Sequence, residues 1–229
     1  MARVYYDQDA DVNDLAGETV AVLGYGIQGR AQALNLRDSG LGVVVGNRDD
    51  AYRDQACADG FEVLSLAEAA GRGDVILVLV PDEAQGEIYE EMIRPGLAPG
   101  KALVFAHGFA IRYGIIQPPQ SIDLLLLAPR LPGKYLRERY LAGSGVPVYI
   151  DVGHDATGRA KRRVLALAKG LGATRVGAME VSFSQETELD HFSEHFVYPL
   201  IVSAIPGLIV VAPAVYGVTL INGLRLPEA

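Results

Sequence analysis

The sequence predicts an α/β protein with a Rossmann-like, doubly wound parallel sheet, followed by a short, mostly helical C-terminal segment. Short apolar runs alternate with stretches of helical pattern along most of the chain, which is typical of a parallel sheet with crossover helices. Several runs are apolar on both faces, as strands are when helices cover both sides of a sheet. A glycine-rich turn joins the first run to the first helical stretch.

The individual elements follow from the hydrophobic pattern and its breaks at glycine and proline. Apolar runs predict strands at residues 19–23, 43–45, 62–64, 74–80, 102–105, 122–128 and 146–150. The stretches between them predict helices at residues 27–36, 50–58, 66–70 and 161–171, and a solvated basic helix face at 134–139. The composition changes near residues 177–181, where we expect a boundary between a Rossmann-like domain at 1–180 and a helical segment at 181–229.

Composition and charge exclude several classes of protein. The 229 residues carry a net charge of −8, whereas a protein that binds nucleic acid needs a basic face for phosphate. The single cysteine, Cys57, cannot form a disulfide framework and is expected to serve in packing. The acidic start lacks the apolar stretch of a signal peptide, so we expect a cytoplasmic protein.

The turn GYGIQG has the spacing of a dinucleotide-binding loop and lies in the right context, between a strand and a helix. Its first glycine allows the tight turn, its second lets a pyrophosphate approach the backbone, and its third allows the helix to pack closely on the strand. The N-terminus of the helix then faces the phosphates. We expect the whole turn to bind cofactor: Gly24, Tyr25, Gly26, Ile27, Gln28 and Gly29.

The residues after the second strand bear on the choice between NAD and NADP. Arg48 would accommodate a 2′-phosphate, whereas Asp49 and Asp50 would repel one and suit a 2′-hydroxyl. The sequence therefore leaves NADP(H) and NAD(H) open, with both Arg48 and Asp50 expected to contact the adenosine ribose.

Several motifs together resemble ketol-acid reductoisomerases, also called acetohydroxy acid isomeroreductases. The resemblance covers about residues 2–195 and includes the segments VYYDQDAD, GYGIQG, LVPDEAQGEIYEE, FAHGFAIRYG, GSGVP, HDATG and QETELDHFSE. It implies a Rossmann domain followed by a knotted helical domain that dimerises. The implied reaction is a Mg²⁺-dependent alkyl migration followed by hydride transfer from NADPH, in branched-chain amino acid synthesis.

The resemblance also assigns roles to individual residues. His107, in AHGF, matches the active-site histidine beside the nicotinamide, and Asp190 and Glu194 match two carboxylates that hold magnesium. Arg130, in APRLPG, stands where the family has lysine, and a broad guanidinium fork does not replace a compact ammonium. The expected catalytic residues are therefore His107, Asp190, Glu194 and Arg130. Asp50 lies where the family has serines for the 2′-phosphate, which weakens a slight preference for NADP and leaves the use of NADH open.

The resemblance implies further metal-binding glutamates beyond Glu194, and the chain stops at Ala229 before they would occur. We therefore expect a C-terminally shortened, diverged member of the family with weakened Mg²⁺ binding. The leading hypothesis is an NAD(P)-dependent oxidoreductase, a paralogue that acts on a keto or imine substrate, with specialised metabolism as one setting for it. Three alternatives stay open: a recruited non-redox cyclase or isomerase with an apolar pocket, a genuine acetohydroxy acid isomeroreductase, and a non-catalytic nucleotide-binding subunit.

The spacing of acidic residues has a physical interpretation of its own. Glu186, Asp190 and Glu194 are four residues apart, so they share one face of a helix, and hard carboxylate oxygens suit Mg²⁺. An acidic, solvated helix face is the alternative. His191 and His195 have the same spacing and could hold a softer ion, although two partly exposed histidines are the favoured interpretation.

The end of the chain is uncharged. Residues 196–224 contain no Asp, Glu, Lys, Arg or His, a run longer than the roughly 20 residues that span a bilayer. Three prolines interrupt the run and no basic cluster flanks it, which disfavours a membrane helix. We expect short helices that bury their apolar side chains in a homodimer formed through residues 181–229.

Overall fold

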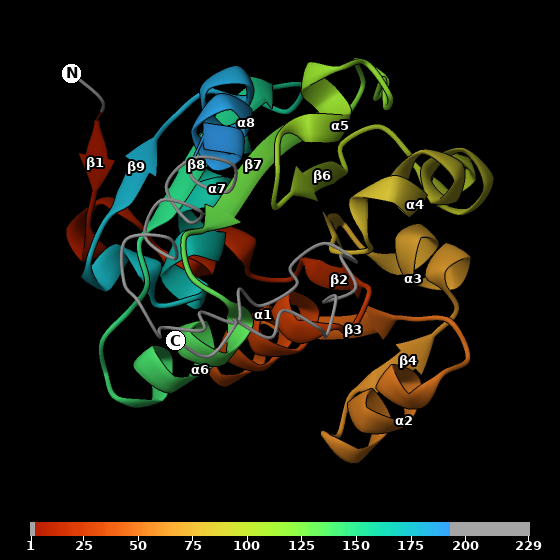
Figure 1. The fold of residues 1–229 in the computed structure, drawn as a ribbon, viewed down its shortest axis with the longest axis horizontal. Helices are drawn as coiled ribbons and strands as arrows, with labels where there is room; N and C mark the ends of the chain where they lie inside the picture. Colours follow the sequence, from red (N-terminus) through yellow and green to blue (C-terminus); the bar gives the residue numbers. More distant parts are fainter. Residues whose placement is uncertain (1–2, 193–229) are drawn as a thin grey trace, which may run out of the picture.

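A computed structural model describes residues 3–192; residues 1–2 and 193–229 are not described. The described residues form one sheet of nine strands with helices on both faces (Figure 1). Across the sheet the strands lie in the order β1-β9-β8-β7-β6-β5-β2-β3-β4. The doubly wound α/β fold predicted from the sequence is confirmed, and each predicted strand is present within a few residues of its expected ends.

The bounds of the elements are as follows. The strands are β1 (Val4–Tyr5), β2 (Thr19–Leu23), β3 (Gly42–Gly46), β4 (Glu62–Leu64), β5 (Val75–Val78), β6 (Ala102–Phe105), β7 (Asp123–Pro129), β8 (Val148–His154) and β9 (Ala178–Glu180). The helices are α1 (Ile27–Asp38), α2 (Ala51–Ala58), α3 (Leu66–Arg72), α4 (Asp82–Ile88), α5 (Phe109–Arg112), α6 (Gly133–Leu141), α7 (Ala160–Gly170) and α8 (Phe183–Phe192). A π-helical turn, Tyr89–Ile93, continues α4.

The sheet is parallel from β4 to β7 and mixed at its other end. β8 pairs antiparallel with β7, β9 pairs parallel with β8, and β1 pairs antiparallel with β9. Antiparallel strands at the edge of a parallel sheet are common in α/β proteins. The sequence pattern does not predict β1 and β9 because strands of two and three residues are too short to give a periodic signal.

Alternate residues of the strands face two separate cores, as a sheet covered on both sides requires. On β2, Val20 and Val22 pack with residues of α1, α2 and α7, whereas Ala21 and Leu23 pack with residues of α3 and α5. Phe183, at the start of α8, belongs to the second core. The helical segment that begins near residue 181 is thus joined to the sheet by an apolar contact, and the domain boundary expected there stays a prediction.

The strand order reverses between β2 and β5. From β2 the chain moves outward to β3 and β4, and it then returns to β5 on the other side of β2. Connections on the two sides therefore leave the carboxyl ends of β2 and β5 in opposite directions, which opens a crevice between them. Ligands of open α/β sheets bind in such a crevice, so the topology predicts the position of the site.

Within residues 3–192, no helix has the length and apolar character needed to cross a membrane. The uncharged run at 196–224, Glu194, His195 and the expected dimer segment beyond residue 192 lie outside the described residues.

Candidate functional site

The carboxyl ends of the central strands border a cleft of about 400 Å³. Its walls are the glycine turn after β2, the loop after β3, the segment from Val78 to Ile88, and His107 after β6. The volume is within the range of ligand sites, and the position is the strand-order reversal between β2 and β5.

The three glycines of the turn differ in the space that surrounds them. Gly24 has a φ of +94°, and a Cβ there would lie 2.8 Å from the carbonyl oxygen of Leu79. A Cβ on Gly29 would lie 1.9 Å from the carbonyl oxygen of Gly24, so α1 can pack on the turn only with glycine. A Cβ on Gly26 would meet nothing within 4 Å. The space over Gly26 is therefore open at the end of α1, where no side chain caps the helix and a phosphate would be favoured.

Two of the three side chains between these glycines, those of Tyr25 and Gln28, hold the turn in place. The ring of Tyr25 is buried, its hydroxyl donates to Asp59 Oδ2 at 2.9 Å, and its backbone N–H donates to Asn47 Oδ1 at 3.0 Å. Gln28 Nε2 donates to the carbonyl oxygen of Leu131 at 3.0 Å, whereas Ile27 is exposed. Tyr25 thus contributes its backbone to the cleft wall while its side chain anchors the turn from beneath.

The loop between β3 and α2 brings Arg48 and Asp50 together at the mouth of the cleft. Arg48 Nε donates to Asp50 Oδ2 at 2.7 Å, and that hydrogen bond lowers the pKa of the Asp50 carboxyl. Asp50 Oδ1 accepts from the backbone N–H of Tyr52 at 2.9 Å and from Asn47 Nδ2 at 2.9 Å. The Asp50 carboxylate therefore fills the N-terminus of α2, which would otherwise attract an anion.

At the other end of the cleft, His107 is held by Glu186 of α8. His107 Nδ1 lies 2.9 Å from Glu186 Oε2, and the backbone N–H of Gly108 donates to the same oxygen at 2.8 Å. Since a carboxylate only accepts, Nδ1 carries the proton and Nε2 is left to face the cleft. A Cβ on Gly108 would lie 2.4 Å from the carbonyl oxygen of Phe183, so glycine lets α8 approach this closely.

The electrostatics of His107 follow from this contact. Burial disfavours the charged imidazolium, but the hydrogen bond that His107 donates to Glu186 and the charges of Glu186, Asp190 and Asp82 outweigh burial and raise the pKa of His107 above its ordinary value. The side chain of Glu186 is 1% exposed. The interpretation of this helix face as solvated is therefore wrong for Glu186, because its carboxylate is turned into the protein by its two hydrogen bonds.

Asp82 is a further acidic group of the site that the sequence analysis did not single out. It begins α4, its Oδ2 lies 4.0 Å from His107 Nε2, and Gln85 Nε2 donates to its Oδ1 at 2.6 Å. Burial raises the pKa of Asp82 to about 6, with His107 opposing and the neighbouring carboxylates reinforcing the shift. The available signal was its place directly after β5, at the edge of the sheet where ligands bind.

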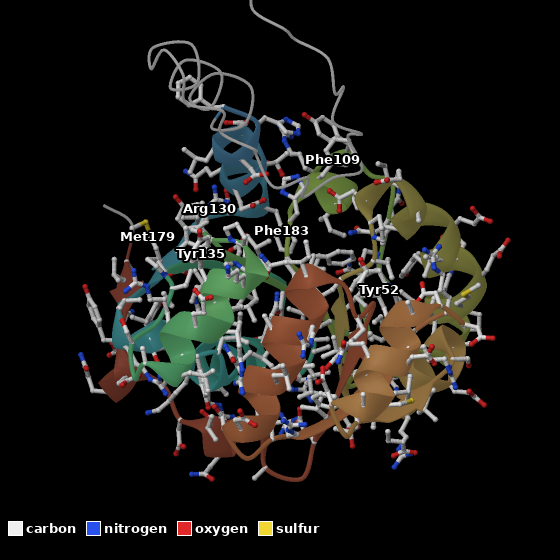
Figure 2. All side chains as sticks on the ribbon, turned by 60° about the horizontal axis from the view of Figure 1, so that its bottom comes forward. Tyr52, Phe109, Arg130, Tyr135, Met179 and Phe183 are labelled. Carbon is white, nitrogen blue, oxygen red and sulfur yellow. The ribbon has the colours of Figure 1, made fainter. Side chains whose placement is uncertain are left out.

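Arg130, which follows β7, completes the cluster. Its Nη1 donates to Asp190 Oδ1 at 2.9 Å and lies 3.5 Å from Glu186 Oε1. Figure 2 shows Arg130 near α8, which begins at Phe183, with Phe109 of α5 on the same side of the molecule, whereas Tyr52 of α2 lies apart. The structure thus brings together His107, Arg130 and Asp190, as the sequence analysis expects, and adds Glu186 and Asp82.

Three of these residues could contribute to a metal site. Ligand atoms of His107, Glu186 and Asp190 lie within 4.8 Å of one another. Two carboxylates directed at one space fit Mg²⁺, which takes one or two protein carboxylates and keeps several waters. His191, considered for a softer ion, instead packs its ring edge-on against His107 and Phe109, with centroids 6.0 and 5.8 Å apart.

Comparison with known proteins identifies the family. Residues 14–177 match the family described as acetohydroxy acid isomeroreductase, NADPH-binding domain. The ketol-acid reductoisomerase (NADP(+)) of Pyrobaculum arsenaticum is 50% identical over 198 residues, which are 86% of this chain and 60% of that protein. The enzyme of the same name from Caldivirga maquilingensis is 51% identical over 197 residues, with the same coverage of 86% and 60%. The chain therefore spans about 60% of the length of these relatives.

Solved structures agree with this relationship. An NADH-preferring ketol-acid reductoisomerase from an uncultured archean superimposes with a TM-score of 0.84 at 40% identity, over 88% of this chain and 66% of that one. A semialdehyde dehydrogenase NAD-binding protein from Cupriavidus necator has a TM-score of 0.70 at 20% identity, over 82% of this chain and 71% of that one, and supports the fold alone. The matched domain, the identity to curated relatives and the shared fold together show that this chain belongs to the acetohydroxy acid isomeroreductase (ketol-acid reductoisomerase) family.

Proposed function

We propose that this chain binds a nicotinamide adenine dinucleotide in the cleft and takes part in the NAD(P)H-dependent conversion of an acetohydroxy acid, the reaction of its family. The observation that carries the proposal is the gathering of His107, Arg130, Glu186 and Asp190 at the opposite end of the cleft from Asp50. A dinucleotide requires a glycine turn for its pyrophosphate, and a polar substrate requires charged groups such as those of this cluster.

The cleft fits the cofactor in its chemistry. The open space over Gly26 and the uncapped N-terminus of α1 would hold the pyrophosphate, and His107 would lie toward the nicotinamide. The dinucleotide would supply the hydride, and a Mg²⁺ ion held by Asp190 and Glu186 would polarise the substrate carbonyl.

The residues of the chain have distinct tasks in this proposal. Glu186 fixes the tautomer and orientation of His107, so that Nε2 is presented to the cleft and to Asp82. Because the pKa of His107 is raised, its imidazole holds a second proton, at Nε2, to a higher pH than an ordinary histidine does, and it would donate this proton to a carbonyl oxygen that gains negative charge. Arg130 adds a permanent positive charge beside the same place.

The loop at the mouth of the cleft favours NADH over NADPH. Asp50 already fills the N-terminus of α2 and holds Arg48 at 2.7 Å, so a 2′-phosphate would displace this carboxylate or lie against it. A 2′-hydroxyl could instead donate to it. Among the relatives, the archean enzyme is described as NADH-preferring and the curated enzymes as NADP(+)-dependent, so both forms occur in the family.

A second candidate is a reductase for a simpler keto or imine substrate, without the alkyl migration. It is favoured by Arg130, which engages Asp190, one of the two carboxylates expected to hold metal. An identity of about 50% to ketol-acid reductoisomerases favours the first candidate.

The test is turnover of 2-acetolactate by the 229-residue chain in the presence of Mg²⁺. Turnover is monitored as the oxidation of NADH or of NADPH, and a simple 2-keto acid is the comparison substrate. Oxidation with 2-acetolactate supports the first candidate, and oxidation only with the 2-keto acid supports the second. Saturable nucleotide binding without either reaction would support a non-catalytic subunit or a recruited non-redox enzyme and would contradict both candidates.

The homodimer through residues 181–229 is part of the same proposal. Of that segment, α8 is described, and its Leu189 is 45% exposed although it is a large apolar side chain. A single exposed leucine is ordinary on a protein surface, so the uncharged run of residues 196–224 in the sequence is what supports the proposed dimer. Sedimentation of the intact chain should give twice the mass of one chain, and a stable monomer would contradict the proposal.

A further inference from the structure

We propose that Arg130 is a built-in counter-cation that competes with a divalent metal ion for the carboxylates of α8, and so sets how tightly this chain takes up Mg²⁺. The proposal rests on the proposed function in one respect, because it takes Asp190 and Glu186 as residues that face a metal ion. Beyond the proposed function, Arg130 would control how readily a metal ion binds these two carboxylates.

The position of one nitrogen atom is the main observation. Nη1 of Arg130 lies 2.9 Å from Asp190 Oδ1 and 3.5 Å from Glu186 Oε1, so a single positively charged group bridges both carboxylates. A divalent ion that joined the same two oxygens would have to lie in the same space. The guanidinium and the metal ion are therefore alternatives at these oxygens.

The rest of the Arg130 residue is anchored away from α8. Its backbone N–H donates to the carbonyl oxygen of Pro147 at 3.0 Å, and its guanidinium carbon lies 4.8 Å from the centroid of the Tyr149 ring. The backbone of Arg130 is thus held beside the start of β8, and its guanidinium, which reaches α8, also rests on the Tyr149 ring. A lysine would keep the charge but lose the planar contact with the ring, which an ammonium cannot make in the same way.

The charge balance explains why a cation is needed there. Asp190 and Glu186 place two carboxylates on one helix face, with Asp82 near the same histidine. Like charges this close destabilise one another unless a positive group lies between them. His107 faces both carboxylates of α8, at 2.9 and 3.8 Å, and Arg130 supplies the permanent charge. A metal ion that took up Oδ1 of Asp190 would therefore break its pair with Arg130.

The experiment is direct titration of Mn²⁺ into the nucleotide-free chain, with free Mn²⁺ followed by electron paramagnetic resonance. Arg130→Gln removes the charge, and Arg130→Lys keeps it without the fork. We expect Mn²⁺ to bind about tenfold more tightly to Arg130→Gln than to the wild type, with Arg130→Lys in between.

Arg137→Lys is the matched control. Arg137 also pairs with an aspartate, Asp38 at 2.5 Å, and its side chain is 21% exposed, close to the 24% of Arg130, but it lies on α6. The Mn²⁺ affinity of the Arg137→Lys variant should equal that of the wild type. Equal affinity of Arg130→Gln and wild type, including no detectable binding by either, or weaker binding by Arg130→Gln, would overturn the proposal.

Thermal unfolding gives a second measurement on the same proteins and shows whether the variants are folded. Without metal, Arg130→Gln should unfold at a lower temperature than the wild type, because its carboxylates have lost their counter-charge. Added Mg²⁺ should raise its unfolding temperature more than that of the wild type, since a ligand stabilises the form it binds more tightly. An equal rise of the unfolding temperature in both proteins would count against competition between Arg130 and the metal ion.

Titration of the wild type with NADH tests the proposed function separately. The proposed function fails if no nucleotide binds, whatever the outcome of the metal titrations.

Discussion

The two ends of the cleft are built in different ways. At the adenosine end, the glycine turn and the Asp50 loop are short segments whose backbone and nearby side chains form the site. At the other end, the charged cluster comes from α4, β6, β7 and α8, with Glu186 and His107 far apart in the sequence. The structure of the first end depends on the space that its glycines leave free. The structure of the second end depends on the balance between its acidic and its basic side chains. Each end should therefore respond to a different kind of substitution.

The largest expected effect is from Gly29→Ala. Its Cβ would lie 1.9 Å from the carbonyl oxygen of Gly24, and backbone on both sides leaves little room to move. We expect a loss of about 3 kcal/mol in the free energy of unfolding, measured by urea denaturation. A loss of less than about 1 kcal/mol would mean that α1 is not tightly packed on the turn.

A somewhat smaller effect is expected from Glu186→Gln at the charged end. It removes a buried charged hydrogen bond to His107, which should cost about 2 kcal/mol in metal-free protein. The pKa of His107 is raised in the folded protein, so this stabilisation is complete below the ordinary value of about 6.5 and is lost as the pH rises through the folded-state value. Urea denaturation should therefore show a larger difference between variant and wild type at acidic pH than at alkaline pH. If the difference in unfolding free energy between variant and wild type grew with rising pH, the pair of His107 and Glu186 could not be its cause.

Gly26→Ala provides the counterpart of Gly29→Ala within the same turn. Nothing lies within 4 Å of a Cβ at Gly26, so the free energy of unfolding should change little. The new methyl group would instead occupy the place of the pyrophosphate and weaken NADH binding by about tenfold. Titration and urea denaturation of both glycine variants would test this division. Unchanged NADH affinity in Gly26→Ala would mean that the phosphates lie elsewhere.

The smallest expected effect is from Asp50→Ser, which alters the mouth of the cleft. Serine can still cap α2, so stability should be almost unchanged, while the negative charge beside the ribose is removed. The affinity for NADPH relative to NADH should rise by about two- to fivefold, as measured by parallel titrations. An unchanged ratio would show that Asp50 does not face the ribose.

The same comparison explains what the sequence could predict. The glycine turn, the strands other than β1 and β9, and the loop with Arg48 and Asp50 follow from local patterns, because the residues that act together are neighbours in the chain. The place of His107, Arg130 and Asp190 was expected only through the family resemblance. The burial of Glu186 and the approach of Asp82 to His107 depend on how α8 and α4 pack on the sheet, and helical spacing gives a common face without saying how deeply it is buried.

The central claim is that the cleft at the glycine turn binds a nicotinamide dinucleotide. Titration of NADH with the wild-type chain tests it most directly, since the chain contains no tryptophan and the emission of the bound nicotinamide can be followed without that interference. The account predicts saturable enhancement of NADH emission, with weaker binding of NADPH. If the emission of NADH and that of NADPH both stay unchanged at all protein concentrations, the claim is contradicted.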